Sequence, residues 1–286
     1  MANIRLIRRR IRGVQSTSKI TRAMEMIATS KMRKAQDAGL AGRPYDEKIR
    51  QVIANLAALP QAGEPRHPLL QSRDVKKIAI VHITPDRGLC GGLNGNINRK
   101  SAAFMLEQKV DVSVITVGRK GSEFMARHTR DLRAEFSKLG DHPSLLDTLP
   151  ISKVVIDDYT NGVVDKVYLV YAKFISTMSQ TPVMEQLLPV EPAVLPELQN
   201  VEYIYEPSPE VVLGELLPRF VEMEIYHAIL ESIASEQSAR MVAMRSATDN
   251  ANELIQDLTL MYNKARQEAI TTELLDITGG AAALNK

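Results

Sequence analysis

Hydrophobic residues recur at helical spacing at both ends of the chain and at strand-like spacing between them. Residues 1–59 and 208–286 show the steps of three and four residues that are typical of a helix with one apolar stripe. Between about residues 75 and 206, short apolar runs alternate with helical stretches. The pattern predicts three domains: an N-terminal coiled-coil helix over 1–59, a central α/β domain over 75–206 and a C-terminal coiled-coil helix over 208–286.

The N-terminal segment carries a coiled-coil seam. Alternating steps of three and four residues fall on Ile4, Ile7, Ile11, Val14, Ser18, Thr21, Glu25, Ala28, Met32 and Ala35, and the register resumes at Ile49, Ile53 and Leu56. A neighbouring stripe covers the polar middle of this seam with Ile20, Met24 and Ile27. The Gly39–Pro44 stretch should bend or interrupt the helix, because glycine and proline both disfavour helical backbone.

The C-terminal segment predicts a longer helix. Ser208, Pro209 and Glu210 supply an N-cap, a proline at the first helical position and an acid in the first turn. From Arg219 to Thr278 there are 60 residues without Gly or Pro, and 13 of 16 seam positions are apolar; the seam includes Met244, Thr248, Ala251, Leu258 and Ala265. At 1.5 Å per residue this helix would be roughly 100 Å long, and Gly279–Gly280 should end it.

Opposite charges favour pairing of the two terminal helices. Residues 1–50 hold 13 Lys or Arg and 4 Asp or Glu, whereas residues 208–286 hold 6 and 12, within a chain of net charge +2. Each charged end could also attract an outside partner. A chain that leaves one helix, forms a middle domain and returns would make the pair antiparallel.

The pattern of the middle segment predicts a Rossmann-like α/β domain. Strands are expected at 77–84, 110–117 and 166–174, with an edge strand bounded by prolines at 182–189. Helices are expected at 93–108, 119–128 and 144–159. The stretches 60–73 and 189–209 hold most of the prolines and look like linkers. The predicted fold class is therefore α/β, with a long antiparallel coiled coil of the two terminal helices.

Composition excludes several classes of protein. A single cysteine, Cys90, rules out an internal disulfide, and no run of 18 apolar residues predicts a membrane span. The first residues lack the apolar stretch of a secretory signal. Arg8–Arg12 is basic, but no aromatic residue precedes Tyr45 to stack on bases, so we expect no nucleic-acid partner. The arginines either meet an acidic protein surface or stay solvated.

A glycine-rich segment, Asp86–Asn96, lies between the first predicted strand and the start of the following helix. In a dinucleotide-binding fold, the phosphates bind at this position. A G-x-G-x-x-G motif would need glycine at 88, 90 and 93, but the last two are Cys90 and Leu93. No G-K-[ST] motif occurs either. A tight strand-to-helix turn is the favoured interpretation, and no cofactor is expected.

No cluster of side chains predicts catalysis or metal binding. Cys90 lacks a histidine at motif spacing and is expected to be a buried thiol rather than a nucleophile. His82 lies on the first predicted strand and His227 on the helix seam, so both are expected to be packed. Cys, His and Asp show no metal-ligand spacing.

Four stretches have the length and composition of family signatures: Gly13–Arg33, Asp86–Asn94, Ser235–Met244, and Tyr262–Thr271 with the following Thr278–Ala283. They resemble the motifs of the gamma subunit of F-type ATP synthases, and the resemblance covers essentially the whole chain. That family has an antiparallel coiled coil of its two termini with an α/β domain at its foot. A bacterial member is expected, because the first motif begins near residue 4 and the chloroplast cysteine pair is absent.

The resemblance implies a non-catalytic rotor shaft. Its coiled coil would thread a ring of alternating alpha and beta subunits, and its foot would sit with the epsilon subunit on the c-subunit ring. Proton flow would turn the shaft and drive ATP synthesis or hydrolysis at the beta-subunit sites, and the shaft would regulate ATPase activity and proton flow. The subunit would lie on the cytoplasmic face of the bacterial inner membrane, without inserting into it.

The resemblance also implies which residues contact partners. Arg266 and Gln267 match a polar pair that hydrogen-bonds a catch loop of a beta subunit. Met24 matches a shaft residue in tight contact with the lower part of the beta subunits. The expected contacts with the c ring come from the bottom turn: Arg43, Tyr45, Tyr203, Tyr205 and Glu206.

Without the resemblance, two other functions fit the pattern. One is a nucleotide-using α/β enzyme with a coiled-coil dimerisation arm, which the missing phosphate and catalytic motifs disfavour. The other is a coiled-coil scaffold unrelated to energy conversion.

Overall fold

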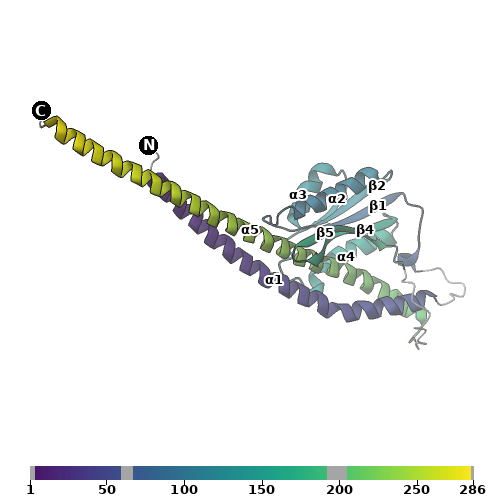
Figure 1. Ribbon diagram of the computed structural model, residues 1–286. Coiled ribbons are helices and arrows are strands. Elements are labelled where there is room, and N and C mark those ends of the chain that lie inside the picture. The colour runs from purple at the N-terminus through teal and green to yellow at the C-terminus, as the bar shows by residue number, and fades with distance from the viewer. Residues whose placement is uncertain (1–3, 59–66, 192–204, 285–286) are drawn as a thin grey trace. The chain divides into compact units, whose positions relative to one another are not determined.

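The computed structural model describes residues 4–58, 67–191 and 205–284. Contacts divide the chain into two units: Met1–Ile27 with Met241–Lys286, here called the helical unit, and Ala28–Arg240, here called the α/β unit. Two helices, α1 (Ile4–Ala58) and α5 (Pro209–Leu284), run through both units (Figure 1). Both long helices predicted from the pattern are thus confirmed.

Helix α1 is not interrupted at Gly39–Pro44, the stretch that was expected to bend or interrupt it. Pro44 lies inside the helix, which runs unbroken to Ala58. Ala35 before the stretch and Ile49 and Ile53 after it are all buried in one core cluster. Packing on both sides therefore outweighs the roughly 3 kcal/mol that an internal proline costs a helix.

Helix α5 does not end at Gly279–Gly280 as expected but continues to Leu284. Each glycine costs a helix only about 1 kcal/mol relative to alanine, and alanine, the strongest helix former, follows at Ala281. Neither glycine adopts the positive φ of a helix C-cap, whereas Gly91, Gly118, Gly140 and Gly162 do have positive φ. The two glycines therefore do not end this helix.

The start of α5 follows the predicted capping chemistry. The Ser208 hydroxyl accepts a hydrogen bond from the backbone N–H of Val211 at 3.4 Å, and Pro209 is the first helical residue. Hydrogen bonds from its own backbone N–H and from Ser208 lower the pKa of Glu210. The cap therefore satisfies an N–H group that the first turn leaves unpaired.

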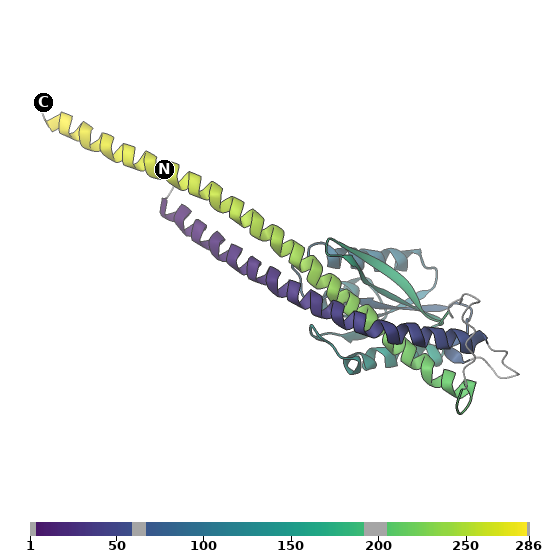
Figure 2. The same cartoon turned by 60° about the horizontal axis from the view of Figure 1, so that its bottom comes forward.

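In the helical unit, α1 and α5 lie side by side and run antiparallel (Figures 1 and 2). The Ser18 hydroxyl donates to Asn252 Oδ1 at 2.9 Å, and Thr21 and Thr248 share a hydroxyl–hydroxyl bond of 2.7 Å. Residue numbers thus rise on one helix as they fall on the other. The buried seam residues of this unit are those predicted from the spacing: Ile7, Thr21, Met244, Thr248, Ala251, Leu258 and Ala265.

The α/β unit is built on a five-stranded sheet of order β3-β2-β1-β4-β5. The strands are β1 (Lys77–Ile83), β2 (Asp111–Val117), β3 (Leu132–Phe136), β4 (Lys166–Ser176) and β5 (Ser179–Leu188). Neighbouring strands pair in parallel except β4 and β5, which are antiparallel, so β5 is the edge strand that the prolines predicted. The sequence analysis missed β3, whose burial is only partial along its length.

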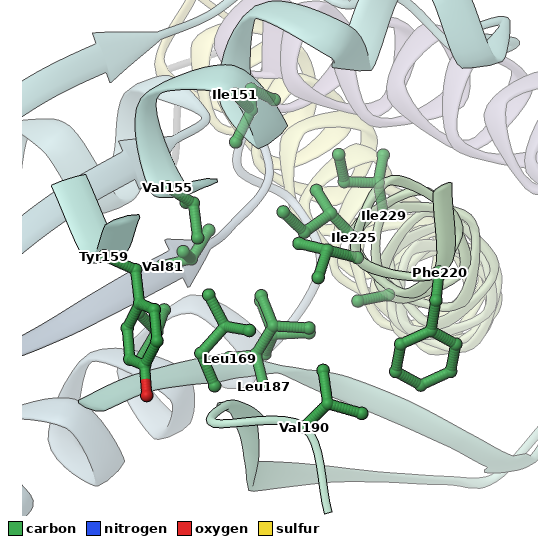
Figure 3. Close-up of a cluster of buried hydrophobic side chains, with 14 of the residues drawn as sticks. Val81, Ile151, Val155, Tyr159, Leu169, Leu187, Val190, Phe220, Ile225 and Ile229 are labelled. Carbon is green, nitrogen blue, oxygen red and sulfur yellow. The ribbon is translucent and has the colours of Figure 1, made fainter. Parts of the chain in front are cut away.

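Helices cover both faces of this sheet: α2 (Leu93–Glu107), α3 (Arg119–His128) and α4 (Leu145–Thr160). On one face, Val81 of β1 and Leu169 of β4 pack with Val155 of α4 and Ile225 of α5 (Figure 3). On the other face, Ile80 packs with Ile97 of α2. A 3-10 turn, Pro68–Leu70, lies within one predicted linker. The described helices include none long and apolar enough to cross a membrane.

Candidate partner-binding surface

The glycine-rich segment forms the tight turn that was the favoured interpretation. Leu89 and Gly91 have φ angles of 64° and 59°, which reverse the chain between β1 and α2. The Cys90 thiol is buried and accepts a hydrogen bond from the Asn94 amide at 3.4 Å. Burial raises the pKa of Cys90, which is opposite to what a nucleophilic thiolate requires.

Asp86, at the start of the glycine-rich segment, occupies the N-terminus of the next helix, α3, where an anion could otherwise bind. One carboxylate oxygen accepts from the backbone N–H of Arg119, the first residue of α3, at 2.9 Å, and the other from that of Lys138 at 3.0 Å. The chain's own carboxylate thus sits at the N-terminus of α3. The sequence analysis did not single out this role, although an acid three residues after a parallel strand was a signal for it.

The remaining candidates for chemistry are packed side chains. His82 is fully buried between Asn98 and Ser101, with ring-nitrogen distances of 2.9 Å and 2.8 Å. Among the described residues, no group of three or more His, Cys, Asp or Glu side chains could hold a metal ion. His82 was correctly predicted to be packed.

Arg266 and Gln267 are exposed on α5, directly after the buried seam residue Ala265. The Ser18–Asn252 and Thr21–Thr248 contacts set a register that places Ile4 opposite about residue 265. The polar pair therefore lies where α5 passes the first described turn of α1. Beyond it, α5 exposes apolar side chains that are 46–65% accessible: Ile270, Leu274, Leu275 and Ile277.

Met24 is half-buried on α1 of the helical unit. On the same face, Ile20 and Ile27 are 59% and 54% exposed, so α5 does not cover the neighbouring apolar stripe. A stripe of large apolar residues left open beside a filled seam is typical of a surface that a partner covers.

The expected bottom-turn residues are described only in part. Tyr203 lies outside the described residues, as does the side chain of Arg43. Tyr45 is 51% exposed on α1, whereas Tyr205 is half-buried and packs against the core cluster beside the start of α5. Glu206 is exposed next to it.

These features define a class of protein. In the helical unit, α1 and α5 pair with each other, and apolar side chains stay exposed along the pair. In the α/β unit, other parts of the same two helices pack against the sheet. Such a molecule belongs to the class of long-helix subunits that bind partner subunits in a larger assembly.

Comparison with known proteins narrows this class to one family. The sequence profile described as ATP synthase matches residues 3–284. The ATP synthase gamma chain of Dehalococcoides mccartyi is 68% identical over 284 residues, covering 99% of this chain and 100% of the relative. That of Herpetosiphon aurantiacus is 50% identical over 295 residues, with both chains fully covered. The chain belongs to the ATP synthase gamma chain family, the central-stalk subunit of the rotor.

Solved structures agree in fold. The central-stalk and c-ring structure of the Tetrahymena thermophila mitochondrial ATP synthase contains a chain with a TM-score of 0.61 and 25% identity, covering 80% of this chain and 99% of that chain. A chain of the Euglena gracilis mitochondrial enzyme gives a TM-score of 0.66 at 21% identity, covering 98% and 94%, and supports the fold alone.

Proposed function

We propose that this chain is the non-catalytic shaft that couples proton flow through the membrane sector to ATP synthesis or hydrolysis at beta-subunit sites. The observation that carries the proposal is the open end of α5, which extends past the first described turn of α1 and exposes apolar side chains. A shaft of this kind does no chemistry. It stabilises a different conformation of each surrounding site at each angle, and so shifts their populations as it turns.

The partners follow from this role. Alpha and beta subunits surround the paired helices, and epsilon and the c-subunit ring bind the foot; the similarity to a chain of the Tetrahymena central stalk and c ring supports this. The subunit is peripheral on the cytoplasmic face of the bacterial inner membrane. It does not itself enter the bilayer and binds no nucleic acid. Control of ATPase activity and proton flow is part of the same proposal.

Individual residues contact different partner subunits. Arg266 and Gln267 bind a beta-subunit loop at particular angles, because the pair offers a charged fork of donors and an amide on an exposed turn. Met24 makes a close apolar contact with the lower part of the beta subunits. The c-ring contacts are assigned to Arg43, Tyr45, Tyr203, Tyr205 and Glu206.

The three predicted domains are kept as a functional division. Residues 1–59 and 208–286 form the shaft, and residues 75–206 form the α/β domain at its foot. The exposed stripe of α1 and the open end of α5 both belong to the shaft segments, which supports this division.

A cross-linking experiment on the assembled enzyme tests the role. Ile270→Cys on the exposed end of α5 provides an accessible thiol, because the natural Cys90 is buried. A cleavable bifunctional maleimide that joins this thiol to a beta subunit should stop multi-turnover ATP hydrolysis and proton pumping. Cleaving the linker should restore both. Full turnover of the cross-linked complex would contradict the proposal, and the unlinked variant is the control.

A further inference from the structure

The motif Ser235–Arg240 of α5 faces inward. In the α/β unit, Ser235 and Ser238 are 0% exposed, Gln237 2% and Arg240 8%. A signature motif of a rotor subunit would be expected to contact partner subunits. These side chains are instead covered by their own chain, so their role must be sought inside the subunit.

The two serines bind the β4–β5 hairpin. The Ser235 hydroxyl donates to the backbone carbonyl of Ala172 in β4 at 2.9 Å. The Ser238 hydroxyl donates to the carbonyl of Thr177, in the turn between β4 and β5, at 2.8 Å, and accepts from the Gln180 amide at 3.3 Å. Strand β4, strand β5 and the turn between them are therefore all hydrogen-bonded to α5.

The rest of the motif binds two other loops. The Arg240 guanidinium donates to the carbonyl of Gly88, in the glycine-rich turn after β1, at 3.1 Å. Glu236, one helical turn earlier, holds that guanidinium through a 2.7 Å ion pair. The Gln237 amide donates to Asp141, in the loop between β3 and α4, at 3.5 Å. Six consecutive residues thus connect α5 to three separate segments of the α/β unit.

These contacts differ in kind from the packing of the preceding turns. Ile225, Ile229 and Ile233 of α5 are buried in the main core cluster. Apolar packing holds a helix against a sheet, but it is non-directional and resists rotation of the helix about its axis only weakly. Hydrogen bonds weaken steeply when their angle changes. Bonds to three segments at once therefore resist both twisting and sliding of α5.

We infer that Ser235–Arg240 is a torsional anchor that fixes the rotational position of α5 relative to the α/β unit while the shaft carries load. Arg240 is the last residue of the α/β unit on this helix, so the anchor occupies the final turns before α5 enters the helical unit. The inference rests on the rotor function proposed above. It assigns to this motif a mechanical role within the subunit and no contact with partners.

The test measures torsional stiffness in the assembled complex. The double variant Ser235→Ala/Ser238→Ala removes three of the five hydrogen bonds that join the motif to the three segments, and it leaves the side-chain volume almost unchanged. With the catalytic head immobilised and the rotor stalled, a probe on Lys109→Cys, an exposed position of the α/β unit, reports angular fluctuation. The variance should rise roughly two-fold if these bonds act in parallel. Ser246→Ala, at an exposed site of α5, is the matched control and should change nothing.

The outcomes separate a mechanical role from a structural one. Unchanged variance in the double variant overturns the inference, even if its melting temperature falls, because the contacts would then only stabilise the fold. Loss of partner subunits from the purified variant also overturns it, since the motif would then be a partner contact. If the double variant does not fold, Ser238→Ala alone removes two of the five bonds and decides the question. Failure of the rotor function itself would appear separately, as no ATP-driven rotation of the unmodified complex.

Discussion

At the scale of single residues, burial decides what each polar side chain does. His82 is enclosed in the α/β unit and bonded to Asn98 and Ser101, whereas Arg266 and Gln267 face outward from α5. Desolvation lowers the pKa of His82 to about 4, against a hydrogen bond to Asn98 that raises it. The neutral ring is therefore part of the packed structure, and the exposed pair is available to partners.

His82 makes the stability of the α/β unit depend on pH. Its pKa is lower in the folded chain than the ordinary 6.5, so the unfolded chain binds more protons between pH 6.5 and 4 and stability falls with falling pH. From pH 7 to pH 5 the free energy of unfolding should fall by about 2 kcal/mol through this group. Urea titrations of the isolated chain at both values would measure the loss. A His82→Gln variant should show a smaller pH dependence, and an equal one would contradict the assignment.

Met24→Lys should impair coupling more than assembly. A lysine brings a charge to a close apolar contact, where it is either left partly desolvated or forms an ion pair with an acidic beta-subunit surface. The buried seam of the helical unit is untouched. Membranes carrying the variant should hydrolyse ATP but pump fewer protons per ATP, measured by dye quenching against phosphate release. Met178→Lys, 77% exposed in the β4–β5 turn, is the control. An unchanged ratio at position 24 would mean that Met24 is only structural.

Replacing Arg266 and Gln267 together with alanine should slow turnover of the assembled enzyme about ten-fold or more. A charge-assisted contact contributes roughly 1.5–3 kcal/mol, and about 1.4 kcal/mol on a barrier is a factor of ten. Steady-state ATP hydrolysis measures this, with subunit composition checked on the same preparation. Glu253→Ala with Gln256→Ala, both exposed on α5, should have little effect. Normal turnover of the Arg266/Gln267 variant would exclude the catch role.

At the scale of elements, local propensity and packing disagree at a few positions, and packing prevails. Helix α1 contains Pro44 and α5 contains Pro218 and two glycines near its end, yet both continue. The turn before α3, by contrast, depends on one glycine. Gly118 has a φ of 95°, and a Cβ there would lie 1.8 Å from the carbonyl oxygen of Thr84.

Two glycine substitutions should therefore have opposite effects. Gly118→Ala should lower the free energy of unfolding by several kcal/mol, because positive φ and a backbone clash act together. Gly39→Ala, in a helical position with nothing within 4 Å of the added Cβ, should raise it by about 0.5–1 kcal/mol. Thermal and urea unfolding of the isolated chain compare them directly. Similar destabilisation by both would show that the glycines are equivalent, contrary to this view.

At the scale of the whole molecule, the sheet resembles a dinucleotide-binding topology but lacks its phosphate motif. The parallel part of the sheet and the turn after β1 resemble a dinucleotide fold, but Asp86 caps α3 and Cys90 and Leu93 replace two motif glycines. One face of the sheet instead packs against the parts of α1 and α5 that belong to the α/β unit.

The isolated chain should accordingly bind no ATP at micromolar affinity and hydrolyse none. A carboxylate at the N-terminus of α3 repels phosphate, and no lysine follows a glycine in the phosphate-loop pattern. Calorimetric titration with Mg-ATP would show the expected lack of heat. Micromolar binding would revive the nucleotide-enzyme alternative.

Sequence alone determined the elements whose signal is local. The seam spacing, the Ser208 cap, the apolar strands β1 and β2 and the proline-bounded edge strand could be predicted because each depends on residues a few positions apart. The candidate residues Met24, Arg266 and Gln267 came from motif resemblance; Arg266 and Gln267 are exposed and Met24 is half-buried.

Tertiary structure decided what depends on residues far apart. β3 has only partly buried positions and forms because β2 pairs with it. Helix α1 passes Pro44 because the sheet and α5 bury its residues on both sides. Ser235 and Ser238 could have faced a partner, and they face β4 and its turn only because the fold brings residues about 60 positions away to them. A helical pattern specifies which side chains share a face, whereas what that face meets is set by packing of the whole chain.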